Sequence, residues 1–491
     1  MTAAGAIAGL LVAIGGYEFA RWQTVRAVRR RLNDSVEGFI QRHNVQLDHF
    51  RFIDRIWVRQ TLLLDPELGE ETAARARATG VSLLTLRDKI DEWLDEIVPY
   101  FNILSYYKLG GAVAQAATNA CYELVFDGAS LERARGQIPR GAVTVYVANH
   151  RSNADYVVLS VGAMRQVALS YAVGEWARVW PLDVLFRSFG SYFVRRGEKD
   201  PLYHRVLERY LQLVAARGLT TAFFLEGGLT RDGQLREPKI GLLDYLIGVL
   251  RREPEREIVF IPVGINYDRV LEDRNLLADT RPTAAAKWRS LVTMMLRAPG
   301  VLLALFARAA VRSHRKQGYA AVTFGNVIPR RSFMPDAADT ARLPDKERRP
   351  HIAKAADFLL AEVHRVVPAT PVALVAVALL GGANDVTTLV RAVREQVAVL
   401  VAAGRPVARG LAFRRSAPTA RSADVQKDQL DDDIADSEDA ERIVDLALLL
   451  LRRRGLVTAD GSALSIAAGA RDVLKFYARS LDAPTHFAFR D

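Results

Sequence analysis

The sequence predicts an α/β fold, a mixed sheet flanked by helices, with further helical regions at both ends of the chain. From Gly141 onward, short β-branched or aromatic runs alternate with helical stretches, which is typical of a layered α/β domain. Between residues 21 and 107, apolar residues instead recur at spacings of three and four, which indicates helices. The expected strands are VTVYVA (143–148), VALSYAV (167–173), YFV (192–194), TTAFFL (220–225), EIVFIPVGI (257–265) and AAVTF (320–324).

Composition limits the class of protein. The chain has 491 residues, of which half are apolar, and this excludes a wholly disordered protein and a polytopic transporter. A single cysteine, Cys121, excludes an internal disulfide framework and a Cys-ligated metal site. Lys and Arg number 67 against 56 Asp and Glu, so the net charge is +11. A surplus of this kind indicates nucleic acid, an anionic membrane or a phosphorylated substrate as partner.

Residues 1–20 form a candidate membrane anchor. Thr2–Tyr17 is uncharged and contains four glycines, and five arginines follow it between positions 21 and 31. A secretory signal would carry its charge before the apolar run, and this run is slightly short of the roughly 20 residues of a spanning helix. Two interpretations stay open: a marginal anchor with the arginines on the cytoplasmic side, or a buried or frayed N-terminal helix.

The rest of the chain divides by texture. We expect a helical N-terminal region at 21–107, an α/β domain at 108–335 with a basic amphipathic insertion at 285–317, and a helical C-terminal region at 345–415 and 438–491, interrupted by a polar linker at 416–437. The segment 287–316 mixes large apolar residues with Arg and Lys, so it is either an interfacial helix pair or a pair packed on the core. The apolar segment 370–383 is too short to span a membrane and predicts a core helix. After the linker, the pattern is a helix, a turn and a small hairpin, similar to a winged helix.

The strand at 143–148 runs directly into NHRSNAD, which contains a candidate general base. His150 stands where α/β folds usually place ligand-handling loops, and Asp155 follows five residues later. On a regular helix the two side chains would point about 140° apart, so a contact requires that Arg151–Asn153 form a turn. Given that turn, the carboxylate accepts the Nδ1 proton and leaves Nε2 free to take a proton from a hydroxyl. The alternative is a helix cap beside a hydrogen-bonded histidine.

Two further fragments suit an anionic ligand. GSYFVRR (190–196) ends a short strand in Arg195 and Arg196, and arginine forks match phosphate oxygens, although such a pair is often only a solvated loop. The segment 220–241 runs from a strand into a glycine turn whose backbone can approach an anion closely, but it lacks the ending of a P-loop. Its candidate residues are Glu226, Gly227, Gly228, Thr230, Arg231 and Lys239.

A fourth fragment, FIPVGINYD (260–268), has Pro262 inside a strand. Proline cannot donate a hydrogen bond to a sheet, so we expect an edge strand or a strand end there, beside a pocket.

In order and spacing, these four fragments resemble the four blocks of the glycerolipid acyltransferases. The blocks NHRSNADYVVLS, GSYFVRRGEKDPLYHRVLERYL, FFLEGGLTRDGQLREPKIGLL and IPVGINYDRVLE are similar to those of the membrane-bound glycerol-3-phosphate 1-O-acyltransferase family. The resemblance covers about residues 95–275 and is fainter at 367–380 and 474–481. It implies a glycerolipid acyltransferase-type sheet, and transfer of a fatty acyl group from acyl-CoA or acyl-ACP to the sn-1 hydroxyl of glycerol 3-phosphate.

The resemblance also implies residue roles. His150 would be the base and Asp155 would orient it, with direct attack on the thioester, no covalent acyl-enzyme, no metal and no cofactor beyond the acyl-CoA or acyl-ACP co-substrate. The phosphate would be held by Arg195, Arg196, Glu226, Gly227, Gly228, Thr230, Arg231 and Lys239. Phe193 and Pro262 would shape the acyl or acceptor pocket.

Two departures from the family pattern leave the acceptor open. Leu229 stands where the family usually has arginine, and Asp268 where it usually has glutamate. Loss of one charged contact costs about 1.5 to 3 kcal/mol of binding. The alternative acceptors are 1-acylglycerol 3-phosphate, dihydroxyacetone phosphate or another lipid.

The resemblance also divides the positive charge between two partners. We expect the block arginines and Lys239 to meet a phosphate, and the arginines of the N-terminal segment and of 287–316 to face anionic lipid. The expected location is the cytoplasmic face of a bacterial cell membrane, either peripheral or through one N-terminal anchor. A nucleic-acid-binding module is disfavoured because aromatic and basic residues do not interleave as in a stacking platform.

Overall fold

The computed structural model describes residues 55–99, 111–163, 169–174, 191–195, 197–277, 316–409, 412–414 and 425–482. The candidate anchor at 1–20, nearly all of the insertion at 285–317 and Arg196 lie outside these residues. Among the helices that the structure describes, none combines the length and the apolar character needed to cross a bilayer.

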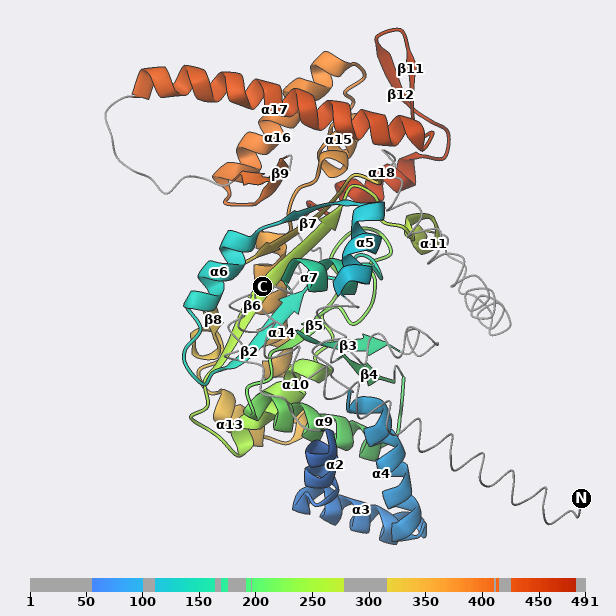
Figure 1. Cartoon of the computed structure of the whole chain (residues 1–491), viewed down its shortest axis with the longest axis vertical. Coiled ribbons are helices and arrows are strands. Elements are labelled where there is room, and N and C mark those ends of the chain that lie inside the picture. The colour runs from blue at the N-terminus through green and yellow to red at the C-terminus, as the bar shows by residue number, and fades with distance from the viewer. Residues whose placement is uncertain are drawn as a thin grey trace, which may run out of the picture.

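A mixed eight-stranded sheet forms the centre of the molecule (Figure 1), which confirms the expected fold class. Its strands are β1 (Glu123–Phe126), β2 (Val143–Ala148), β3 (Ser170–Gly174), β4 (Tyr192–Val194), β5 (Thr221–Phe224), β6 (Ile258–Tyr267), β7 (Tyr319–Phe324) and β8 (Ile328–Pro329). The order is β1-β7-β6-β2-β5-β3-β4, with β8 also paired to β6. Strands β6, β2, β5, β3 and β4 run parallel, whereas β7 and β8 are antiparallel to β6. All six expected strands are present, and β1 and β8 were not expected.

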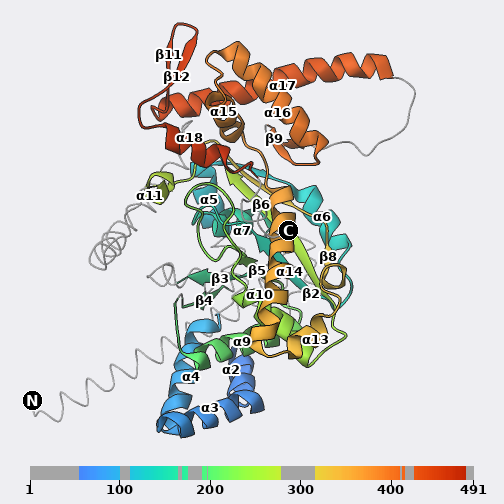
Figure 2. The same cartoon turned by 180° about the vertical axis from the view of Figure 1, so that it is seen from behind.

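Both faces of the sheet are buried, and successive side chains along a strand point alternately into two hydrophobic cores. In β2, Tyr146 and Ala148 face one core, and Val143, Val145 and Val147 face the other. The helices around the sheet are α5 (Gly111–Cys121), α6 (Gly128–Gly136), α7 (Asp155–Ala163), α9 (Pro201–Ala216), α10 (Gly241–Ile247), η3 (Gly248–Arg251), α11 (Asp273–Leu277), η4 (Arg330–Ser332), α13 (Ala337–Arg342) and α14 (Asp345–Val366). Helix α14 crosses behind the sheet in Figure 1 and in front of it in Figure 2.

Pro262 lies within a central strand, so the expectation of an edge or a strand end was wrong. On one side β6 pairs with β2, where Pro262 is opposite Val147. On the other side β8 pairs as far as Phe260 and β7 begins at Val263, so the proline falls in the gap between them. The Pro262 carbonyl accepts the Gly325 N–H there, in the turn between β7 and β8. Its missing N–H would point the same way, where no ladder bond is required.

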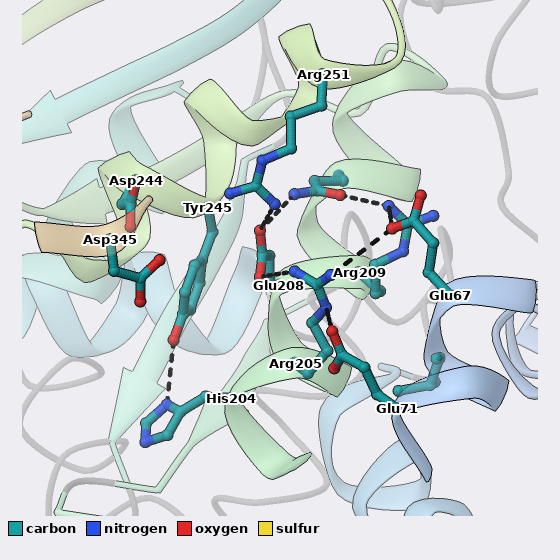
Figure 3. Close-up of polar contacts among 12 residues, drawn as sticks. Glu67, Glu71, His204, Arg205, Glu208, Arg209, Asp244, Tyr245, Arg251 and Asp345 are labelled. Carbon is teal, nitrogen blue, oxygen red and sulfur yellow. Dashed lines mark hydrogen bonds and ion pairs between the residues drawn. The ribbon is translucent and has the colours of Figure 1, made fainter. Parts of the chain in front are cut away.

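Three N-terminal helices pack against α9: α2 (Arg55–Leu63), α3 (Pro66–Thr79) and α4 (Leu83–Ile97). Asp65 caps α3 by accepting the Leu68 N–H at 3.1 Å, and its other oxygen receives Arg209 of α9 at 2.5 Å. Figure 3 shows further pairs across the same junction, among them Arg205 of α9 with Glu71 of α3 at 2.9 Å. The junction therefore combines an apolar contact with a band of ion pairs.

The C-terminal region sits over one end of the sheet (Figure 1). It comprises α15 (Pro371–Leu380), α16 (Val386–Ala402), α17 (Val425–Arg453) and α18 (Arg471–Ala478), with hairpins β9 (Val407–Arg409)/β10 (Ala412–Arg414) and β11 (Val457–Asp460)/β12 (Ala463–Ile466). The core helix expected at 370–383 is confirmed, because α15 is buried along nearly its whole length. The small hairpin expected after a helix is β11/β12. The linker predicted at 416–437 is wrong from Val425 onward, because α17 begins there. That stretch contains no Gly or Pro, and a charged sequence without these residues is compatible with a helix.

Candidate active site

The site is built on the loop that leaves the central strand β2. Asn149 is fully buried, and its side chain exchanges two hydrogen bonds of 2.8 Å with the backbone N–H and C=O of Ile265 in β6. The side chain thus continues the β2–β6 pairing by one step after the backbone turns away. This anchor delivers His150 to the carboxyl-terminal edge of the parallel strands.

His150 and Asp155 are in contact through a tight turn that precedes α7. Asp155 Oδ2 lies 2.8 Å from His150 Nδ1 and accepts the backbone N–H groups of Arg151 at 2.7 Å and Ser152 at 3.1 Å. The buried carboxylate orients the imidazole, since it favours a proton on Nδ1. The His150 ring stacks on Phe224 with centroids 4.1 Å apart, and its Nε2 has no hydrogen-bond partner in the ranges that the structure describes. The arrangement leaves Nε2 available as a base.

Two side chains, one at the end of β6 and one just after it, hydrogen-bond to this turn. Tyr267, at the end of β6, donates its hydroxyl to Asp155 Oδ1 at 2.6 Å. Glu272 accepts the hydroxyl of Ser152 at 2.8 Å and the side-chain amide of Asn153 at 3.1 Å. Both lie in the fourth sequence block, but sequence reasoning assigned neither a role, because more than 110 residues separate them from the turn.

Glu226 supports His150 through the backbone. Its Oε1 accepts the His150 N–H at 2.7 Å and its Oε2 accepts the Arg236 N–H at 2.8 Å. Burial raises the pKa of Glu226 to about 8, opposed by these two N–H donors. The Thr230 N–H also donates to the His150 carbonyl, at 3.1 Å. The glycine turn therefore packs around the base, and both oxygens of the Glu226 carboxyl group accept backbone N–H groups.

The C-terminal helix α18 reaches the same loop through Arg151. This guanidinium is buried, donates to the Gly233 carbonyl at 2.8 Å, and lies 5.1 Å from the centre of the Phe476 ring. Burial lowers the pKa of Arg151. Gly233 has φ of +94° and a Cβ there would lie 1.9 Å from the Phe476 carbonyl oxygen, so only glycine fits. The arginine after the base thus ties the third block to the C-terminal region.

A cavity of about 250 Å³ opens beside the His150 ring. Its wall is mainly apolar, with side chains such as Val173, Val194 and Phe223. Lys239 lines it as well, with its stem against Gly227, where φ is +62°. The other polar lining residues are Tyr156, His204 and Tyr245.

The remaining candidates stand apart from this cavity. Arg195 gives two bonds to Glu96 of α4, from Nε at 2.8 Å and Nη2 at 2.6 Å, so its guanidinium is held by a carboxylate. The Thr230 hydroxyl is used within its own turn, donating to the Gln234 carbonyl at 2.6 Å. Residues that do not line the cavity are the exposed Arg231, the packed Gly228, and the buried Phe193 and Pro262. No group of three metal-ligating side chains occurs among the described residues.

Comparison with known proteins agrees with this arrangement. Residues 133–266, which carry the parallel strands β2 to β6 almost completely and the His–Asp turn, match a family model described as Acyltransferase, so this part of the α/β domain is of the acyltransferase class. Residues 303–447 match a model described as Glycerol-3-phosphate acyltransferase C-terminal region. Over these two segments the chain is similar to the glycerol-3-phosphate acyltransferase family.

Curated relatives carry the same description. "Glycerol-3-phosphate acyltransferase" from Aeromonas hydrophila subsp. hydrophila is 28% identical over 323 residues, 64% of this chain and 38% of that protein. The protein of the same description from Pseudomonas fluorescens is 32% identical over 192 residues, 38% of this chain and 23% of its own length. The chain thus spans less than two-fifths of the relatives it matches. Among solved structures, the 1-acyl-sn-glycerophosphate acyltransferase PlsC from Thermotoga maritima covers 52% of this chain and 81% of its own, at 14% identity and a TM-score of 0.29, a likeness too low to bear on the fold.

Proposed function

We propose that the protein transfers a fatty acyl group from an acyl thioester, acyl-CoA or acyl-ACP, to the sn-1 hydroxyl of glycerol 3-phosphate. The product is lysophosphatidate, and the reaction begins phospholipid synthesis. The observation that carries the proposal is the 2.8 Å contact between Asp155 Oδ2 and His150 Nδ1, which leaves Nε2 beside the cavity. The matches to glycerol-3-phosphate acyltransferases support the choice of acceptor.

In this mechanism, Nε2 of His150 takes the proton of the acceptor hydroxyl while its oxygen attacks the thioester carbonyl carbon. A tetrahedral intermediate forms and then collapses, breaking the carbon–sulfur bond. The thiolate leaves and receives the proton from His150, which restores the neutral base. Asp155 holds the imidazole and stabilises its positive charge while the proton is carried.

The two substrates would occupy different parts of the site. The apolar wall of the cavity suits the acyl chain, since it offers burial of methylene groups at the base. Lys239 and the exposed Arg231 supply positive charge for the acceptor phosphate on the glycine turn. Arg195 could join them only by exchanging its contacts with Glu96.

Arg236 offers a replacement for the charge that is missing at Leu229. Its Nη1 donates to the Leu229 carbonyl at 3.2 Å. A Cβ at Gly228 would lie 2.9 Å from this Nη1 atom. A guanidinium therefore covers the glycine turn at the position of the departure from the family pattern. This contact favours a phosphorylated acceptor over an uncharged one.

The membrane association is also part of the proposal. The apolar run Thr2–Tyr17 and the basic, apolar segment 287–316 suit a protein at the cytoplasmic face of a bacterial membrane, in contact with anionic lipid. Separating cell membranes from the soluble fraction, followed by a carbonate wash, distinguishes an anchored protein from a peripheral one. Recovery of the full-length protein in the soluble fraction alone would contradict it.

The activity is tested with His150→Ala. Purified protein receives palmitoyl-CoA and labelled glycerol 3-phosphate, and lysophosphatidate is measured. We expect a loss of about 10²–10⁴-fold, the usual contribution of a general base. His351→Ala, at an exposed histidine of α14, is the matched control and should keep full activity. Full activity in His150→Ala would contradict the assignment of His150 as the base. If the wild-type protein acylates 1-acylglycerol 3-phosphate or dihydroxyacetone phosphate faster than glycerol 3-phosphate, the proposed acceptor is wrong.

A further inference from the structure

A second cavity, of about 520 Å³, lies at the amino-terminal ends of the central strands, whereas His150 lies at their carboxyl-terminal ends. It is formed by the three turns that lead into the adjacent parallel strands β5, β2 and β6. The cavity shares no lining residue with the cavity beside His150. Parallel strands place their amino ends together, so anything bound here is separated from the candidate base by the length of β2.

Each of the three turns contributes one arginine to this cavity. Arg140 precedes β2, Arg217 precedes β5 and Arg256 precedes β6. None of the residues that line the cavity is acidic, and the carboxylate contact of these arginines within the described part of the chain is Glu253 with Arg256, at 3.5 Å. Three arginines around one space concentrate positive charge there, and a bound anion would offset that charge.

Two of the arginines are already held in place. Arg256 donates from Nη2 to the Ala216 carbonyl at 2.9 Å. Arg217 lies over the ring of Trp57 from α2, with its guanidinium carbon 4.5 Å from the ring centre. Arg140 is exposed and has no ion pair or hydrogen bond from its side chain to any residue that the structure describes. The pocket therefore has two positioned cations and one that is unengaged.

Two threonines of the cavity wall add neutral hydrogen-bond donors to the arginines. Thr144 and Thr220 line the cavity and are only 6% and 4% exposed. Neither hydroxyl has a hydrogen-bond partner within the described ranges. Both threonines line the cavity, so their hydroxyls can donate to a group bound there.

We propose that this cavity binds a phosphate-bearing anion. Arginine forks match phosphate oxygens in charge and geometry, and threonine hydroxyls complete the set of donors. The source is either a soluble phosphate or diphosphate compound or the headgroup of an anionic phospholipid. The site is separate from the proposed acyl transfer, and its existence does not depend on that activity.

Calorimetric titration of inorganic pyrophosphate tests the site. The protein is the full chain carrying Lys239→Gln, which weakens anion binding beside His150. We expect one binding event whose Kd rises at least tenfold in Arg140→Gln and in Thr220→Val. Arg342→Gln removes an exposed arginine outside the cavity and should leave the Kd unchanged. Melting temperatures establish that each variant is folded. If either Arg140→Gln or Thr220→Val does not fold, the other variant still tests the site.

Vesicle sedimentation distinguishes the two sources. Phosphatidylcholine vesicles with and without phosphatidate are compared for the same proteins. Binding that needs both phosphatidate and Arg140 assigns a lipid headgroup, whereas binding of pyrophosphate alone assigns a soluble phosphate compound. The proposal is overturned if neither probe binds, or if Arg140→Gln and Thr220→Val bind both probes as well as Arg342→Gln does.

Discussion

Removal of the Tyr267 hydroxyl tests how the candidate base is held. Tyr267 donates to Asp155 Oδ1 at 2.6 Å, and no other hydrogen bond to that oxygen occurs in the described ranges. Burial raises the pKa of Tyr267 well above 10, so the hydroxyl keeps its proton at any working pH. Tyr267→Phe deletes this donor without changing the ring, and the bonds on Asp155 Oδ2 remain.

The size of the effect follows from the charge and burial of the acceptor. A hydrogen bond to a charged group contributes about 1.5–3 kcal/mol, and here its loss leaves a buried carboxylate oxygen without a donor. At 1.36 kcal/mol per tenfold change, full transfer of this loss to the transition state lowers kcat/KM by roughly 10- to 150-fold. Asp155 would be held through Oδ2 alone, which weakens its alignment with His150 Nδ1, so we expect kcat to fall more than KM rises.

The assay measures thiol release from palmitoyl-CoA at varied concentrations of glycerol 3-phosphate. Tyr122→Phe is the matched control, because Tyr122 is equally buried, its ring centroid is 5.3 Å from that of Tyr267, and its hydroxyl donates to the Arg269 carbonyl instead. Wild-type kcat/KM in Tyr267→Phe would refute the positioning role. An equal loss in Tyr122→Phe would show that the effect is general to this core.

Three further predictions concern stability. Burial raises the pKa of Glu226 from 4.5 to about 8, so the folded protein binds one more proton than the unfolded chain between these pH values. Its free energy of unfolding therefore falls as pH rises from about 4.5 to about 8. Denaturant titrations should show a smaller fall in Glu226→Gln, and a fall equal to that of the wild type contradicts this prediction. Asp65→Asn keeps the cap of α3 but removes the buried charge partner of Arg209, which then has only a 3.7 Å contact with the exposed Glu67 carboxylate. We expect a destabilisation of up to about 3–5 kcal/mol in urea unfolding, and a loss of less than about 1 kcal/mol would show that the pair is dispensable. Phe476→Ala removes the fully buried ring next to Arg151 and should cost about 3–5 kcal/mol together with acyltransferase activity; normal activity in the folded variant would separate α18 from the site.

Local patterns were sufficient for most of the fold. All six expected strands are present because their runs are apolar on both faces, as a sheet covered by helices requires. Strands β1 and β8 were missed because they are short and lie toward the edge of the sheet, where the sequence signal is weak. Pro262 was misjudged because its tolerance depends on where β7 and β8 pair with β6, which is a property of three strands together.

The candidate site divides in the same way. His150 and Asp155 are five residues apart, so the sequence alone predicts that a contact between them requires a turn. The partners of that turn could not, since Tyr267, Glu272 and Phe476 lie more than 110 residues further along the chain. Arg195 likewise meets Glu96, a partner 99 residues away on α4.

By itself, the sequence determined the α/β class, the order of the four blocks and the residues within the turn, because these depend on periodicity and short spacing. Only the tertiary structure decided which charges are available. It occupies Glu226 with two backbone N–H groups and Arg195 with a carboxylate, while it leaves Lys239 beside the base. The physical reason is that the effect of a charged group depends on its burial and its partners, and both are set by packing between distant segments.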